Sequence, residues 1–123
     1  MGRLTLDPEA YHPRAIGARD KHNAIVNEVA TAVARDHIVV VGMAQNPHVK
    51  RARKALDGRE FTYLEYGSYL GMWKERLAIK MWSGWPTFPM VFVNGKLLGG
   101  ASDLVAAIAA GELDRLLTDK KDG

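Results

Sequence analysis

Apolar residues recur at helical intervals in some stretches of the chain and form short β-branched or aromatic runs in others. Ile25, Val29 and Val33 lie four residues apart and predict a first helix that begins at Asp20. The run that follows, 38–41, contains only Ile and Val. Because both sets of alternating side chains are apolar, this run is typical of a central strand covered by helices on each face.

A strand–helix–strand unit is predicted next. Asn is a favoured N-cap and Pro fits the first helical position, so Asn46-Pro47 predicts a helix start, and Gly58 ends that helix. Residues 61–65 then have the composition of a second strand. The short connections predict a parallel pair of strands joined by a right-handed crossover.

The second half of the chain predicts a helix followed by a hairpin. The helix spans about 69–81, and its expected buried side carries Leu70, Trp73, Leu77 and Met81. Asn94-Gly95 is the strongest two-residue hairpin signal and lies between strands predicted at 90–93 and 96–98. Two further helices are expected over 102–110 and 113–117.

The order of these elements predicts one α/β domain with a mixed four-stranded sheet. We assign residues 20–118 to this domain. Pro8, Pro13 and Gly17 with scattered charge indicate an irregular arm over 1–19, and residues 119–123 a frayed tail.

Composition and charge change this interpretation little. No apolar run approaches the length of a membrane span, and the N-terminus lacks a secretion signal, so we expect a cytoplasmic location without membrane contact. The net charge of +3 permits anion binding. The basic cluster Lys50, Arg51, Arg53 and Lys54 has no interleaved aromatic residues, which favours a solvated helix face over a nucleic-acid site.

The chain contains no cysteine. This absence excludes disulfides, thiolate nucleophiles and cysteine-bound zinc or iron–sulfur clusters. His12, His22 and His37 have no metal-ligand spacing, so no metal site is predicted.

The segment 82–103 resembles the C-terminal half of monothiol glutaredoxins. It carries a W-P-T-F-P block at 85–89, a hairpin with Asn94-Gly95 and then a G-G-x-x-D motif that ends at Asp103. The resemblance extends from about Asp20 to about Leu117. It implies a thioredoxin-like (glutaredoxin) fold, with the four-stranded mixed sheet flanked by helices and an extra helix at the N-terminus.

The chain departs from this family at the active site. Aligning the basic cluster puts residues 46–49, N-P-H-V, where the family carries C-P-Y-C or C-G-F-S. Asn46 therefore occupies the nucleophile's position, and a carboxamide cannot replace a thiolate. The lysine that usually precedes the motif is also missing from the loop 43–45. The thiol–disulfide exchange and iron–sulfur cluster assembly that the resemblance implies do not carry over.

Positions that hold glutathione in the family are better preserved. The resemblance implies that a helix N-terminus binds one carboxylate, that Phe88 before a cis-Pro89 meets an extended peptide, and that a basic side chain binds a second carboxylate. The candidate ligand-binding residues are Arg76, Lys80, Thr87, Phe88, Pro89, Gly100, Ser102 and Asp103. Ser102 and Asp103 are equally explained as helix caps, so both interpretations stay open.

Two candidate catalytic residues remain, Asn46 and His48. Asn46 is explained by helix capping alone, whereas a neutral His48 beside an emptied thiol pocket could act as a general base. The sequence thus favours a redox-inactive protein that binds glutathione or another small carboxylate. The alternatives are an enzyme performing cysteine-independent chemistry on a small anionic or aromatic metabolite, and a scaffold that uses the basic helix face. Glutathione is the one cofactor-like ligand implied, and the oligomeric state is not determined.

Overall fold

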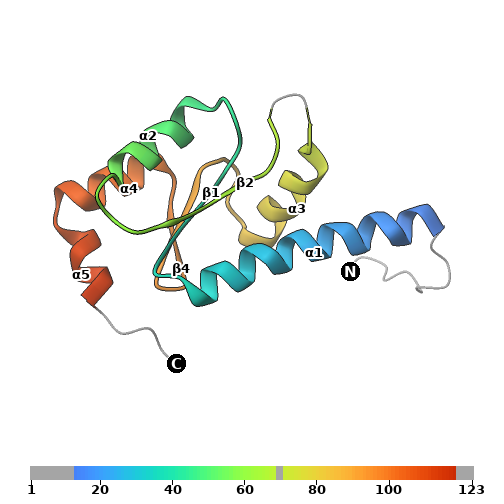
Figure 1. The fold of residues 1–123 in the computed structure, drawn as a ribbon, viewed down its shortest axis with the longest axis horizontal. Helices are drawn as coiled ribbons and strands as arrows, with labels where there is room; N and C mark the ends of the chain where they lie inside the picture. Colours follow the sequence, from blue (N-terminus) through green and yellow to red (C-terminus); the bar gives the residue numbers. More distant parts are fainter. Residues whose placement is uncertain (1–12, 69–70, 119–123) are drawn as a thin grey trace, which may run out of the picture.

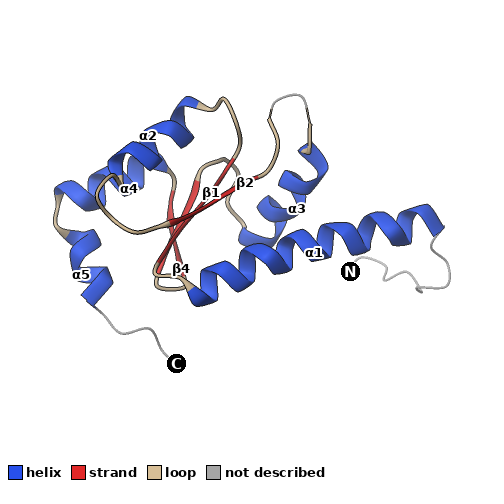
Figure 2. Cartoon of the chain, in the orientation of Figure 1, coloured by secondary structure: helices blue, strands red, loops and turns tan. Residues whose placement is uncertain are grey.

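In the part of the chain that the structure describes, four short strands form one sheet, and five helices cover its two faces (Figure 1, Figure 2). The computed structural model describes residues 13–68 and 71–118, with side chains from residue 24 onward. In chain order the elements are α1 (Pro13–Arg35), β1 (Ile38–Gly42), α2 (Pro47–Ala55), β2 (Thr62–Glu65), α3 (Trp73–Ser83), β3 (Met90–Val93), β4 (Lys96–Gly99), α4 (Ala101–Ala109) and α5 (Glu112–Thr118).

The strand order is β2-β1-β3-β4. β1 pairs with β2 in parallel, and β3 pairs with both β1 and β4 in an antiparallel arrangement. The sheet is therefore mixed, and the α/β architecture predicted from the sequence is confirmed.

The central strand β1 is buried on both faces, as its composition predicts. Val39 and Val41 belong to the core between the sheet and the α1–α3 layer, whereas Ile38 and Val40 belong to the core beneath α2, α4 and α5. β3 alternates in the same way. Two hydrophobic cores thus share one pair of strands, and Figure 2 shows the helices in layers on either side of the sheet.

The first helix is longer than expected. It begins at Pro13 and not at Asp20, so seven residues assigned to the irregular arm are helical. Proline is favoured in the first turn of a helix, where its missing N–H costs nothing. The rest of the predicted arm, residues 1–12, and the predicted tail, 119–123, lie outside the described residues. No helix in the described part of the chain is long and apolar enough to cross a membrane.

The predicted hairpin is confirmed. Asn94 and Gly95 both have positive φ, 49° and 84°, as a two-residue turn of this kind requires. The Asn94 side-chain amide also donates to the Leu116 carbonyl at 2.7 Å, which ties the hairpin to α5.

The predicted buried side of α3 is wrong. Trp73, Leu77 and Met81 are exposed, and the side chains that face inward are Glu75, Arg76 and Ile79. Ile79 lies in the core against α1. The apolar four-residue repeat lies on the exposed face, whereas the buried face carries Glu75 and Arg76 beside Ile79, so apolar spacing predicted the wrong face.

Arg76 holds the connection between β2 and α3. Its Nη1 donates to the carbonyls of Tyr66 at 3.0 Å and Gly71 at 2.6 Å. The Tyr66 hydroxyl in turn donates to the Glu28 carboxylate on α1. Burial and the Glu28 carboxylate raise the pKa of Tyr66 well above its ordinary value. Arg76 and Tyr66 together tie this connection to α3 and α1.

We expect paired substitutions on α3 to distinguish its two faces. Ile79→Ala should lower the free energy of unfolding by about 2–5 kcal/mol, because it leaves a cavity in the core. Met81→Ser should change that free energy by no more than about 0.5 kcal/mol, because the side chain is exposed. Urea denaturation of the two variants checks this, and a larger loss for Met81→Ser would show that the helix packs by its other face.

Removing the Arg76 guanidinium should destabilise the fold. Arg76→Met keeps the aliphatic stem but leaves two carbonyls without their charged donor, at an expected cost of about 1.5–3 kcal/mol. The midpoint of urea denaturation measures the loss, and Arg76→Lys should recover part of it. Arg76→Met with wild-type stability would contradict the role assigned here.

Candidate functional site

Three connections meet at one end of the sheet. β1 ends at Gly42 and leads toward Asn46, β3 begins at Met90 directly after Pro89, and β4 ends at Gly99. Val41 pairs with Met90, and Val91 pairs with Gly99, so these strand ends are neighbours. The topology therefore brings together three segments that are far apart in the sequence.

Asn46 caps α2 at this end. Its Oδ1 accepts the backbone N–H groups of His48 at 2.8 Å and Val49 at 3.1 Å, and the residue is only 8% exposed. Pro47 occupies the first helical position, as predicted. The carboxamide oxygen is thus engaged in satisfying the helix N-terminus. This geometry supports the capping interpretation of Asn46, while His48 lies exposed in the first turn of α2.

The N-terminus of α4 forms the second part of the site. Gly100 is the N-cap and supplies no capping side chain. Its own N–H donates to the Asp103 carboxylate at 2.9 Å. At Gly99, φ is +137° and an added Cβ would lie 2.3 Å from Asp103 Oδ2, so this position requires glycine. The Asp103 carboxylate is therefore turned back toward the connection between β4 and α4. Because the N-cap is glycine, no N-cap side chain covers the first turn of α4.

Trp85 and Pro89 border the same glycine. A Cβ at Gly100 would lie 3.6 Å from the Pro89 carbonyl oxygen and 3.8 Å from Trp85 Nε1. Trp85 Nε1 is buried and has no hydrogen-bond partner among the described residues. An unpartnered buried donor is uncommon in a folded protein. The W-P-T-F-P block and the G-G motif are thus in direct proximity.

Arg51 is a residue of this site that the sequence analysis did not select. Its Nη2 donates to the Ser102 hydroxyl at 2.6 Å, which links α2 to the first turn of α4. Its only sequence signal was membership of the basic cluster on α2. The contact places a guanidinium beside a helix N-terminus, where the macrodipole already favours an anion.

Of the remaining predicted residues, Lys80, Thr87 and Pro89 lie beside Phe88. The Phe88–Pro89 peptide bond is cis, as the resemblance implied, and the Phe88 side chain is buried. Lys80 Nζ lies 5.5 Å from the centre of the Phe88 ring, whereas Thr87 is exposed. Arg76 is 8% exposed and binds backbone carbonyls, which favours Lys80 over Arg76 as the basic ligand-binding residue.

The basic face of α2 has its own contacts. The Arg53 guanidinium lies 4.1 Å above the centre of the Tyr63 ring. Burial and a hydrogen bond to Glu65 raise the pKa of Tyr63 to about 12, so the ring keeps its proton at neutral pH. This arrangement explains part of the cluster as packing against β2.

The arrangement offers hydrogen-bond donors and positive charge rather than a nucleophile. The chain has no cysteine, and no group of three or more potential metal ligands occurs among the side chains described within 24–68 and 71–118. Backbone N–H groups of α4, the Arg51 guanidinium and the Lys80 ammonium suit carboxylates.

Known proteins with similar sequences are glutaredoxins or glutaredoxin-like proteins. The chain is 49% identical over 94 residues to a glutaredoxin-like protein of Dictyostelium discoideum, across 75% of this chain and 76% of that protein. It is 35% identical over 80 residues to monothiol glutaredoxin-S17 of Arabidopsis thaliana, which covers 63% of this chain and only 16% of that longer protein. No protein-family model matches the chain.

Solved structures have the same fold. Oxidized glutaredoxin 2 from Chlamydomonas reinhardtii superimposes with a TM-score of 0.67 at 30% identity, over 78% of this chain and 92% of that one. A buckwheat glutaredoxin–glutathione complex gives a TM-score of 0.66 at 24% identity, over 80% of this chain and 92% of that one. Because the sequence identity and the structural superposition agree, the chain belongs to the glutaredoxin family, of which it is a cysteine-free member.

Proposed function

We propose that this chain binds glutathione, or another small carboxylate, at the N-terminus of α4 and performs no thiol–disulfide exchange. The observation that carries the proposal is the contact between Arg51 and Ser102 at 2.6 Å. It adds a fixed positive charge to a helix N-terminus whose N-cap, Gly100, has no side chain. Charge-assisted donors of this kind favour a carboxylate over a neutral ligand.

Asp103 and Phe88 would hold the rest of a peptide ligand. The Asp103 carboxylate beside Gly100 suits the ammonium group that glutathione carries next to its γ-glutamyl carboxylate. The backbone of Phe88 before cis-Pro89 suits strand-like pairing with an extended peptide. Lys80 beside the Phe88 ring would meet the second carboxylate. The buckwheat complex indicates that this fold accommodates glutathione.

Asn46 supports the absence of thiol chemistry. It lies at the head of α2, where the family carries its nucleophile, and its amide oxygen is engaged by two backbone N–H groups. A carboxamide is neither a nucleophile nor a leaving group in disulfide exchange. The scaffold would therefore retain a ligand without exchanging electrons with it.

Isothermal titration with reduced glutathione tests the binding proposal. The wild-type chain should release or absorb heat at millimolar glutathione, and Arg51→Ala should weaken binding by about threefold to tenfold through loss of one charge-assisted contact. Lys54→Ala is the matched control, because it removes an exposed cation from the same helix. No heat at millimolar glutathione would exclude a glutathione site, and titration with succinate would then test a simpler carboxylate.

Restoring a thiol tests the role of position 46. Asn46→Cys should become glutathionylated by oxidised glutathione and should reduce a mixed disulfide, because a thiol at a helix N-terminus has a lowered pKa. His48→Cys is the control, with an exposed thiol two residues away, and should react more slowly. Mass spectrometry and a coupled reductase assay measure both. Mixed-disulfide reduction by the wild-type chain would refute redox inactivity.

A further inference from the structure

Exposed large hydrophobic side chains are concentrated at one place. Among the described residues, five of the six lie on α3 or directly before it: Met72, Trp73, Leu77, Met81 and Trp82. The sixth is Val105 on α4. Single exposed apolar side chains are ordinary, but a contiguous group of them marks an interaction surface.

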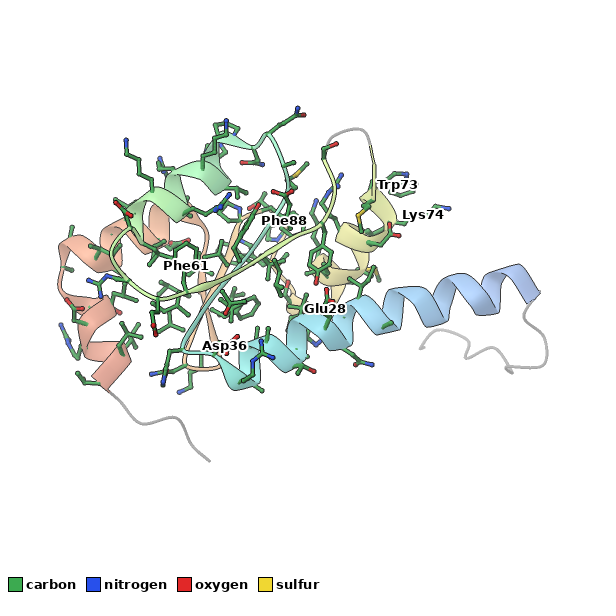
Figure 3. All side chains as sticks on the ribbon, viewed as in Figure 1. Glu28, Asp36, Phe61, Trp73, Lys74 and Phe88 are labelled. Atoms are coloured by element: carbon green, nitrogen blue, oxygen red, sulfur yellow. The ribbon has the colours of Figure 1, made fainter. Side chains whose placement is uncertain are left out.

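Three of these residues form a straight ridge. Trp73, Leu77 and Met81 are four residues apart and are 61%, 46% and 76% exposed. At a rise of 1.5 Å per residue the ridge is about 12 Å long. It runs along the side of α3 away from Arg76 and Ile79, which face the protein. In Figure 3, Trp73 and Lys74 point away from the body of the molecule. We call these three residues the α3 ridge.

The exposed charges that α3 itself carries beside the ridge have one sign. Lys74 Nζ lies 5.7 Å from the centre of the Trp73 ring, and Lys80 lies on the other flank. The one carboxylate on α3, Glu75, is buried. The exposed face of this helix is therefore apolar along its centre and cationic at its edges.

We infer that the α3 ridge docks an amphipathic helix of a partner protein whose apolar stripe is flanked by acidic residues. Apolar anchors at i, i+4 and i+8 match the spacing at which two helices pack against each other. Acidic flanks would pair with Lys74 and Lys80. Lys80 is common to this inference and the glutathione proposal. The α3 ridge and Lys74 are not, since Arg51 and Ser102 belong to helices on the opposite face of the sheet.

A second copy of this chain is a poorer occupant. Two identical ridges would bring the lysines of both copies together. Three side chains over about 12 Å also fall short of the roughly 800 Å² per partner that a stable interface buries. A single helix with the opposite charge fits both the size and the sign of this surface.

Two synthetic helical peptides probe the inference with the full chain. Each has about three heptads with Leu at positions a and d; one carries Glu at e and g and the other carries Lys. The acidic peptide should bind at micromolar concentration by fluorescence anisotropy and change the tryptophan emission. The basic peptide should bind at least about tenfold more weakly, as charge repulsion requires.

Variants at exposed positions test which residues of the chain contact the peptides. Leu77→Ser should weaken binding of the acidic peptide at least about tenfold, as loss of a central anchor does. Val105→Ser, the matched control on α4, should leave binding unchanged. Lys74→Glu should weaken binding of the acidic peptide and strengthen binding of the basic one. Circular dichroism of each variant verifies that the fold is retained.

Several results would overturn the inference. Equal binding of the two peptides would show that charge plays no part, and binding unaffected by Leu77→Ser would place the contact elsewhere. If the acidic peptide does not bind and the chain instead sediments with phosphatidylserine vesicles, the ridge contacts a membrane surface. A dimer in analytical ultracentrifugation that Leu77→Ser dissociates would assign it to a second copy.

Discussion

Burial of β1 on both faces determines how the rest of the chain is arranged. Its five residues are all buried, and a strand without a polar face must have an apolar layer on each side. α1 and α3 supply one layer, and α2, α4 and α5 supply the other. Because β1 lies between β2 and β3, its carboxyl end also determines where the connections of the site meet.

Asn46 shows how a side chain can complete the start of a helix without supplying a nucleophile. A residue at the head of α2 must satisfy free backbone N–H groups, and Asn46 does this with its side-chain oxygen. A thiol at the same place would gain reactivity from the same helix dipole. The carboxamide thus stabilises the start of α2, beside the segments that contain Gly99, Gly100 and cis-Pro89.

The two faces of α3 differ in what they contact. Inward, Arg76 binds the carbonyls of the β2–α3 connection and Ile79 enters the core. Outward, an apolar ridge flanked by lysines remains uncovered in the described structure. Burying an arginine is tolerated because its donors are matched to backbone carbonyls and its stem is apolar.

The sequence by itself determined the sheet, the hairpin and the family. The β-branched run 38–41, Asn94-Gly95 and Asn46-Pro47 each specify a conformation through local sterics or hydrogen bonding, so they needed no knowledge of distant residues. The absence of cysteine was equally plain, because chemistry requires the atom itself. Only the tertiary structure decided which face of α3 is buried, that Arg76 donates to backbone carbonyls and that Arg51 reaches Ser102. These outcomes depend on contacts between segments far apart in the chain, and the apolar repeat of α3 lies on its exposed face, so local spacing could not predict them.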